Sequence, residues 1–149
     1  MANALERRPI LKTLEEKKQE ILKKFGAFEQ WEERYKLLLD FGKKLSPMDE
    51  KYKVDKYLVP GCISKVWLYS EEAGDKLVFY ADSESAMARG MIGLLVYVYS
   101  GQKAEDILAH PADFLSSVGI DTHLSMSRRN GIANMCRLIF SYAGKDEDE

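Results

Sequence analysis

Two cysteines and two histidines are the residues of this 149-residue sequence best suited to nucleophilic or metal chemistry. They are Cys62, Cys136, His110 and His123, and each stands alone in the chain. Zinc sites use closely spaced pairs such as C-x-x-C or H-x-x-x-H, and iron–sulfur clusters need several converging thiolates. Glycine-rich phosphate loops of the G-x-x-x-x-G-K-S/T and G-x-G-x-x-G types are also absent. We therefore expect neither a bound metal nor a resident cofactor.

Cys62 stands between a predicted turn and a predicted strand, in the segment Val59-Pro60-Gly61-Cys62-Ile63-Ser64. The Pro-Gly pair predicts the turn, because proline fixes φ and glycine tolerates a positive φ. The β-branched and aromatic residues that follow predict a strand over residues 64–70. This position suits a reactive thiol, although a packed structural cysteine is an equal alternative. Cys136 lies in the apolar stripe of a predicted helix, which indicates a core residue.

A cysteine acts as a nucleophile in its thiolate form, so the thiolate has to be stabilised. A free thiol with a pKa of ~8.5 is only about 3% thiolate at pH 7, and lowering that pKa by ~1.5 units requires about 2 kcal/mol. Lys65, Arg128 and His123 could supply this stabilisation if the fold brings them near. A hydrolase triad is an alternative, in which His123 is the base and Asp82 or Asp121 orients its imidazole. No segment resembles an oxyanion loop, however.

The composition is that of an ordinary globular protein, with 46% hydrophobic and 31% charged residues. A net charge of −2 and a pI near 5.8 do not favour nucleic acid as a partner. No stretch reaches the ~20 apolar residues of a membrane span, and the N-terminal segment lacks the apolar core of a signal peptide. We expect one domain over residues 1–149 with disordered tails at about 1–8 and 144–149. A cytoplasmic location with free thiols and no membrane partner follows.

Hydrophobic periodicity predicts the elements that must position these side chains. Helices are predicted over residues 9–25, 28–44, 83–100, 104–109, 111–118 and 128–143, and strands over 64–70 and 76–81, joined by a five-residue loop at 71–75. Thr13 followed by Glu16 matches a capping box, which leaves the start of the first helix open. Residues 91–99 are apolar nearly all round, as in a central helix, and Gly90 and Gly93 would let a neighbour approach closely. The pattern predicts an α+β fold, a small antiparallel sheet packed with helices.

Several short blocks occur in a set order between about residue 28 and residue 142. They are Arg34-Tyr35 with Gly42-Lys43, Val59-Pro60-Gly61-Cys62-Ile63-Ser64-Lys65-Val66-Trp67-Leu68, Asp82-Ser83 with Gly90, Tyr99-Ser100-Gly101, and His123-Leu124-Ser125-Met126-Ser127-Arg128-Arg129-Asn130-Gly131-Ile132 with Met135. In this combination they resemble the SufE family of sulfur-acceptor proteins, which partner cysteine desulfurases in iron–sulfur cluster assembly. Two positions depart from the family pattern, since Met126 replaces an expected proline and Ser85 an expected small apolar residue.

The resemblance implies a SufE/IscU-like two-layer fold and a function for Cys62. This cysteine would take sulfur from the persulfide of a SufS/CsdA-like desulfurase, stimulate that enzyme, and relay the sulfur to an Fe–S scaffold complex. The chain would then be a sulfur carrier and activator rather than an enzyme, and pyridoxal phosphate would belong to the desulfurase. The chemistry is a thiolate displacement at sulfur. The resemblance also implies that Asp82, His123 and Arg128 support the cysteine loop or contact the partner.

The cysteine count favours an acceptor over a cluster scaffold, because a scaffold needs several thiolates and a relay needs one. Two alternatives stay open. The chain could bind and activate a desulfurase non-covalently, with Cys62 structural, or it could be a cysteine-dependent hydrolase. For the acceptor, we expect a loop that shields Cys62 at rest and turns it outward on docking, with Gly61 as the pivot.

Overall fold

The computed structural model describes residues 12–144, so the tails expected at residues 1–8 and 145–149 lie outside the described residues. Gly144 was expected to belong to the C-terminal tail, but it is the last residue of a helix. Between residues 12 and 144, no helix is both long enough and apolar enough to cross a bilayer.

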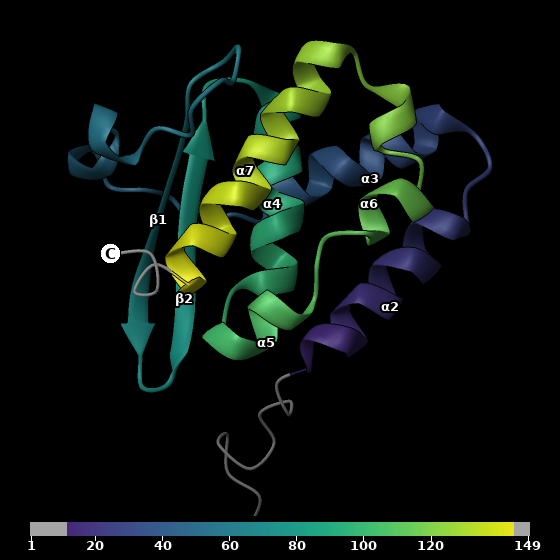
Figure 1. The fold of residues 1–149 in the computed structure, drawn as a ribbon. Coiled ribbons are helices and arrows are strands. Elements are labelled where there is room, and N and C mark those ends of the chain that lie inside the picture. Colours follow the sequence, from purple (N-terminus) through teal and green to yellow (C-terminus); the bar gives the residue numbers. More distant parts are fainter. Residues whose placement is uncertain (1–11, 145–149) are drawn as a thin grey trace, which may run out of the picture.

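The described chain forms a three-stranded antiparallel sheet with helices packed against it. The α-helices are α2 (Leu14–Gly26), α3 (Trp31–Lys43), α4 (Ala86–Tyr99), α5 (Ala104–Ala109), α6 (Phe114–Ser117) and α7 (Met126–Gly144). The short 3-10 helices are η1 (Glu50–Tyr52), η2 (Asp55–Tyr57) and η3 (Asp121–His123). The strands are β1 (Val66–Ala73), β2 (Lys76–Ser83) and β3 (Gln102–Lys103). Figure 1 shows β1 and β2 at one side, α4 and α7 next to them, and the other helices beyond α4. The predicted α+β class is confirmed.

The strands form a tighter hairpin than the sequence predicted. Ala73 pairs with Lys76, so the connection is the two-residue turn Gly74-Asp75, with Gly74 at a φ of 68°. The predicted five-residue loop is therefore wrong. Residues 71–73 continue β1 beyond the core, where their exposed side chains remain in water. The short strand β3, which the sequence did not predict, pairs with the start of β2.

The starts of α2 and α7 follow local capping groups. Helix α2 begins at Leu14 because Thr13 Oγ1 accepts a hydrogen bond from the Glu16 amide (3.1 Å), and the Glu16 carboxylate accepts one from the Thr13 amide (2.9 Å). The capping box is therefore present, and the predicted start at residue 9 is not the start of α2. Helix α7 begins two residues earlier than predicted. Ser125 lies before it and accepts from the amide of Arg128 (3.3 Å). The other predicted boundaries shift by up to three residues.

Helix α4 is the buried centre of the helical layer, as its apolar sequence predicted. Its glycines allow α3 to approach backbone to backbone. A Cβ added at Gly90 would lie 2.7 Å from the carbonyl oxygen of Leu38, and one added at Gly93 would lie 2.5 Å from that of Phe41. Gly42 faces Gly90 from α3 in the same way. The close approach expected for Gly90 and Gly93 is confirmed.

The segment that holds η1 and η2 lies on the side of β1 away from α4 and α7 (Figure 1). An aromatic cluster packs between this segment and the sheet. Trp67 and Tyr69 are buried there, and the Tyr52 ring stacks on Tyr69 with centroids 4.1 Å apart. Both faces of the sheet are therefore covered, one by the main core and the other by the aromatic cluster. The cysteine loop directly precedes β1 in the chain.

Candidate site around Cys62

Cys62 lies in a loop over residues 60–65 that is closed at its base. The Val59 amide donates a 2.8 Å hydrogen bond to the carbonyl of Val66, the first residue of β1. Gly61 has a φ of 75°, so the predicted Pro-Gly turn is present. The strand was predicted to begin at residue 64, so Cys62 is farther from β1 than expected. The reason is that the ladder between β1 and β2 begins only where Val66 pairs with Ser83.

The Cys62 thiol rests on helix α7. Its Sγ lies 3.8 Å from the Gly131 carbonyl oxygen, within the range in which a thiol donates a weak hydrogen bond. A Cβ added at Gly131 would lie 3.5 Å from the sulfur. The thiol is half-buried and packs against the main core. The cavity beside it is about 10 Å³, and its walls come from the loop, α4 and α7, with Ala88, Met91, Ser127, Arg128, Gly131 and Met135.

Two opposing influences act on the thiol. Burial raises the pKa of Cys62, and the positive charge of Arg128 lowers it, but burial is larger and the pKa lies above its usual value. The hydrogen bond to the Gly131 carbonyl also favours the neutral form, because only a protonated thiol can donate it. The conformation described therefore favours the neutral thiol of Cys62.

Arg128 is the predicted site residue that the fold brings to Cys62. It lines the same small cavity from the first turn of α7. One guanidinium nitrogen lies 3.5 Å from Ser85 Oγ, which is at the limit for a hydrogen bond. Ser85 Oγ also caps α4 by accepting from the Ala88 amide (3.2 Å). Ser85, which departs from the family pattern, thus links the starts of α4 and α7 next to the thiol.

Asp82 supports the loop from a distance and does not contact the thiol. Its carboxylate pairs with Lys53 (3.1 Å) and Arg89 (2.9 Å), and accepts from the Ser83 amide (2.7 Å). Burial acts to raise the pKa of Asp82, but these partners outweigh it and the pKa is lowered. The Ser83 hydroxyl donates to the Lys65 carbonyl (2.7 Å), which ties the end of the cysteine loop to β2.

His123 lies in η3, against α3. Its ring stacks on Trp31 with centroids 4.5 Å apart, and Nδ1 lies 2.9 Å from the Gly119 carbonyl oxygen. None of the contacts described for His123 or Asp82 between residues 12 and 144 involves Cys62. The hydrolase alternative therefore lacks its base at the thiol in this conformation.

Cys136 packs against the main core from α7, and burial raises the pKa of its thiol to about 12. It is nevertheless partly exposed. Across residues 12–144, no three His, Cys, Asp or Glu side chains are grouped as metal ligands. The chemistry available around Cys62 is therefore that of a single thiol.

The sequence did not predict Gly131 and Asn134 as parts of the loop's support. They follow Arg128 at intervals of three residues on α7, and helical residues three or four apart share a face. A Cβ added at Gly61 would collide with the amide nitrogen of Asn134. This spacing was the signal in the sequence that could have identified both residues once Arg128 was placed beside Cys62.

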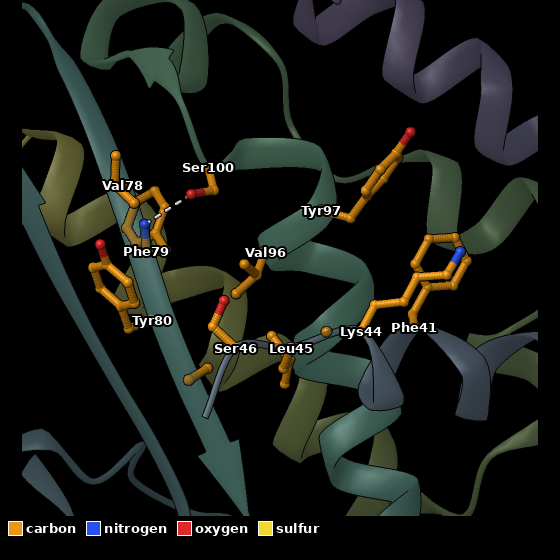
Figure 2. Close-up of a pocket in the computed structure, with 12 residues that line it drawn as sticks. Phe41, Lys44, Leu45, Ser46, Val78, Phe79, Tyr80, Val96, Tyr97 and Ser100 are labelled. Atoms are coloured by element: carbon orange, nitrogen blue, oxygen red, sulfur yellow. Dashed lines mark hydrogen bonds between the residues drawn. The ribbon is translucent and has the colours of Figure 1, made fainter. Parts of the chain in front are cut away.

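A larger cavity lies elsewhere. It measures about 320 Å³ and lies between β2, α4 and the end of α3. Figure 2 shows Val96 of α4 and Ser100, the residue after α4, opposite Phe79 of β2, with Ser100 Oγ accepting from the Phe79 amide at 2.9 Å. Neither Cys62 nor Arg128 lines this cavity. The candidate site around Cys62 is thus defined by its loop and not by cavity size.

A family model described as "SufE: Fe-S metabolism associated domain" matches residues 19–143. The chain belongs to the SufE family. This confirms the resemblance that the blocks around Cys62 and Arg128 suggested, and it places the protein in a family associated with iron–sulfur metabolism.

Three relatives illustrate the similarity. The chain is 36% identical over 132 residues to "SufE-like protein 1, chloroplastic/mitochondrial" of Arabidopsis thaliana, covering 87% of this chain but 35% of that protein. It is 33% identical to an uncharacterized SufE-like protein of Rhizobium meliloti, covering 83% and 92% of the two chains. It is 31% identical to the "Cysteine desulfuration protein SufE" of Wigglesworthia glossinidia brevipalpis, covering 83% and 87%. The chain therefore spans about a third of the Arabidopsis relative and most of the bacterial ones.

The fold also matches a solved structure. The solution structure of a hypothetical protein from Thermus thermophilus superposes with a TM-score of 0.73 at 20% identity, covering 87% of this chain and 94% of that one. At this identity the match concerns the fold alone.

Proposed function

We propose that this SufE-family protein accepts sulfur on Cys62 from a cysteine desulfurase and stimulates that enzyme by removing its persulfide. An iron–sulfur scaffold complex is then the recipient of the sulfur. Family membership and the relative named for cysteine desulfuration support this proposal. The observation that carries it is a lone, half-buried thiol on a glycine-pivoted loop beside an arginine.

The transfer is a displacement at sulfur. The Cys62 thiolate attacks the terminal sulfur of the desulfurase persulfide and forms a new S–S bond. The S–S bond to the desulfurase cysteine breaks, and that cysteine leaves as a thiolate, which takes up the proton that Cys62 released. Persulfide is consumed on one protein and formed on the other, so no external oxidant or reductant is required.

The resting site explains why transfer waits for the partner. Burial and the Gly131 carbonyl keep the Cys62 thiol neutral, so the loop has to turn outward before the thiolate can attack. Gly61 supplies the pivot because its positive φ lies where other residues are strained. The positive charge of Arg128 acts on the Cys62 thiol, and it stabilises the thiolate as the loop moves.

Two exposed apolar side chains flank the thiol and are contacts for the partner. Ile63, directly after Cys62, is 71% exposed, and Met126, directly before the Ser127–Arg128 wall of the cavity, is 67% exposed. Isolated exposed apolar residues are common, but apolar anchors next to a reactive residue suit a protein interface. The stacked rings of Trp31 in α3 and His123 in η3 form a further contact surface for the desulfurase.

The test is sulfur loading followed by mass measurement. The protein is incubated with a desulfurase and cysteine without reductant, and its intact mass and peptide map are recorded. We expect added mass of one or more sulfur atoms on Cys62, lost in Cys62→Ser and retained in the matched control Cys136→Ser. A Cys62→Ser variant that still stimulates the desulfurase fully would support the non-covalent activator instead. Hydrolysis of ester or peptide substrates without desulfurase would support the hydrolase.

A further inference from the structure

The pivot of the cysteine loop rests directly on one side chain of α7. Gly61 has a φ of 75°, and the space where its Cβ would lie is occupied by the amide nitrogen of Asn134. Asn134 therefore takes the place of a side chain at position 61. The contact is possible only because residue 61 is glycine.

Asn134 is itself held in place on its helix. Its side-chain oxygen accepts a hydrogen bond from the guanidinium of Arg137, one turn along α7. Pro60 and Asn134 also line a cavity of about 210 Å³ together with Arg137, Leu138 and Ser141. The start of the loop and the Asn134 side chain thus lie next to each other at the edge of this open space.

The loop meets α7 at three successive positions of one helix face. Arg128 lines the cavity beside the thiol, Gly131 accepts from Cys62 Sγ, and Asn134 lies against Gly61. We propose that Asn134 is a positioning residue that seats Gly61 on α7 and so sets how often Cys62 is released from Gly131. The functional consequence of this inference rests on the proposed role of Cys62 as sulfur acceptor, but the positioning itself does not.

Alkylation of the isolated protein tests the seating of the loop without any desulfurase. A shielded thiol reacts in proportion to the population of its open form when opening and closing are fast. In Asn134→Ala, loss of the contact should raise the rate of Cys62 alkylation by iodoacetamide about three- to tenfold, the effect of a lost side-chain contact. The rate is read from the tryptic peptide that contains Cys62.

Two controls separate loop release from general loosening of the fold. Cys136 lies on the same helix and packs against the core, so its alkylation should remain unchanged in Asn134→Ala. Asn130→Ala makes the same substitution one turn earlier on α7, at an exposed position, and should leave both rates unchanged. Equal acceleration at Cys62 and Cys136, or an unchanged Cys62 rate in Asn134→Ala, would overturn the proposal.

A double-mutant cycle tests the pairing of the two residues. Gly61→Ala adds a Cβ that collides with Asn134, so it should accelerate Cys62 alkylation more than Asn134→Ala does. In the double variant the collision is relieved, and the combined effect should be smaller than the product of the two single effects. A strictly multiplicative result would contradict direct positioning. The alkylation measurements decide the role of Asn134 without any desulfurase. If Cys62 gains no sulfur from a desulfurase, the proposed function is contradicted, but the alkylation result is unaffected.

Discussion

At the scale of single residues, the Cys62 thiol is held neutral at rest but placed beside a cation. Burial and the Gly131 carbonyl favour the protonated form, and Arg128 favours the thiolate. Under the proposed function, opening the loop would remove the first two influences and make the thiol accessible. The site would then combine protection at rest with reactivity on docking.

Removal of Arg128 tests its part in this balance. Because Arg128 lowers the pKa of Cys62, Arg128→Ala should raise that pKa further. The pH profile of Cys62 alkylation should shift to higher pH, and sulfur acceptance at pH 7 should fall severalfold at an unchanged melting temperature. Lys65→Ala is the matched control, because it removes an exposed positive charge from the same loop. An unchanged profile with a lower melting temperature would show that Arg128 only packs.

The exposed side chain of Ile63 gives a second prediction at this scale. Ile63→Ser should raise the protein concentration needed for half-maximal stimulation of the desulfurase about tenfold, as expected for an apolar interface anchor. Alkylation of Cys62 in the isolated protein should not change. Leu108→Ser alters an apolar side chain that is 44% exposed on α5, and it should have no effect on stimulation. Equal effects of the two substitutions would contradict a specific docking contact.

At the scale of elements, the α3–α4 contact fixes the helix whose start forms one wall of the site. Gly93→Ala would place a Cβ 2.5 Å from the Phe41 carbonyl oxygen, and neither backbone can yield easily. We expect a loss of about 2–4 kcal/mol in the free energy of unfolding, the range of strong overpacking. Urea denaturation measures it. Gly26→Ala, at the end of α2 with no atom within 4 Å of the added Cβ, should be neutral or stabilising.

Elements with local signals could be predicted from the sequence, and those set by distant partners could not. The Thr13–Glu16 capping box and the apolar run of α4 lie within a few residues, so both were recognised. The two residues of β3 are too short for any periodicity and exist because β2 lies beside them. The hairpin turn was placed too early because exposed residues 71–73 look like a loop in sequence and become strand only by pairing.

The same distinction applies to the site. Cys62 could be identified from its Pro-Gly turn and family block, both of which are contiguous in sequence. The fold brings Arg128 beside the thiol, whereas His123 stacks on Trp31 of α3, and its role in loop support or partner contact stays a prediction. Asn134 was missed because its importance depends on where the loop crosses α7. A residue whose role depends on where a loop crosses a helix can be recognised only from the tertiary structure.

At the scale of the whole molecule, α7 connects the cysteine loop to the sheet. Its first half carries Arg128, Gly131 and Asn134 beneath the loop, and near its end Tyr142 donates a 2.9 Å hydrogen bond to the Leu68 carbonyl of β1. Since β1 also begins at the end of the loop, both sides of the loop are attached to elements that are hydrogen-bonded to each other. Under the proposed function, we expect the outward movement in the segment between Val59 and Val66.

A second long-range link joins α2 to α4 through Glu20. Its carboxylate pairs with Lys12 (2.7 Å) and Lys24 (3.0 Å) and accepts from the Tyr97 hydroxyl (2.6 Å). Burial acts to raise the pKa of Glu20, but these partners outweigh it and lower the pKa from 4.5 to about 2. A depressed carboxyl pKa stabilises the folded state above the unfolded pKa, so this contribution is full above about pH 5 and is lost as the pH falls towards 2.

Glu20→Gln should therefore remove part of the acid sensitivity of the protein. We expect the variant to unfold at lower urea concentration than the wild type at pH 7, and the difference to shrink as the pH is lowered from 5 to 2.5, because the wild type then loses its ionised carboxylate. Glu29→Gln changes an exposed carboxylate between α2 and α3 and should leave the wild-type pH dependence intact. A Glu20→Gln deficit that is equal at pH 7 and pH 2.5 would mean that the side chain acts through packing and not through its charge.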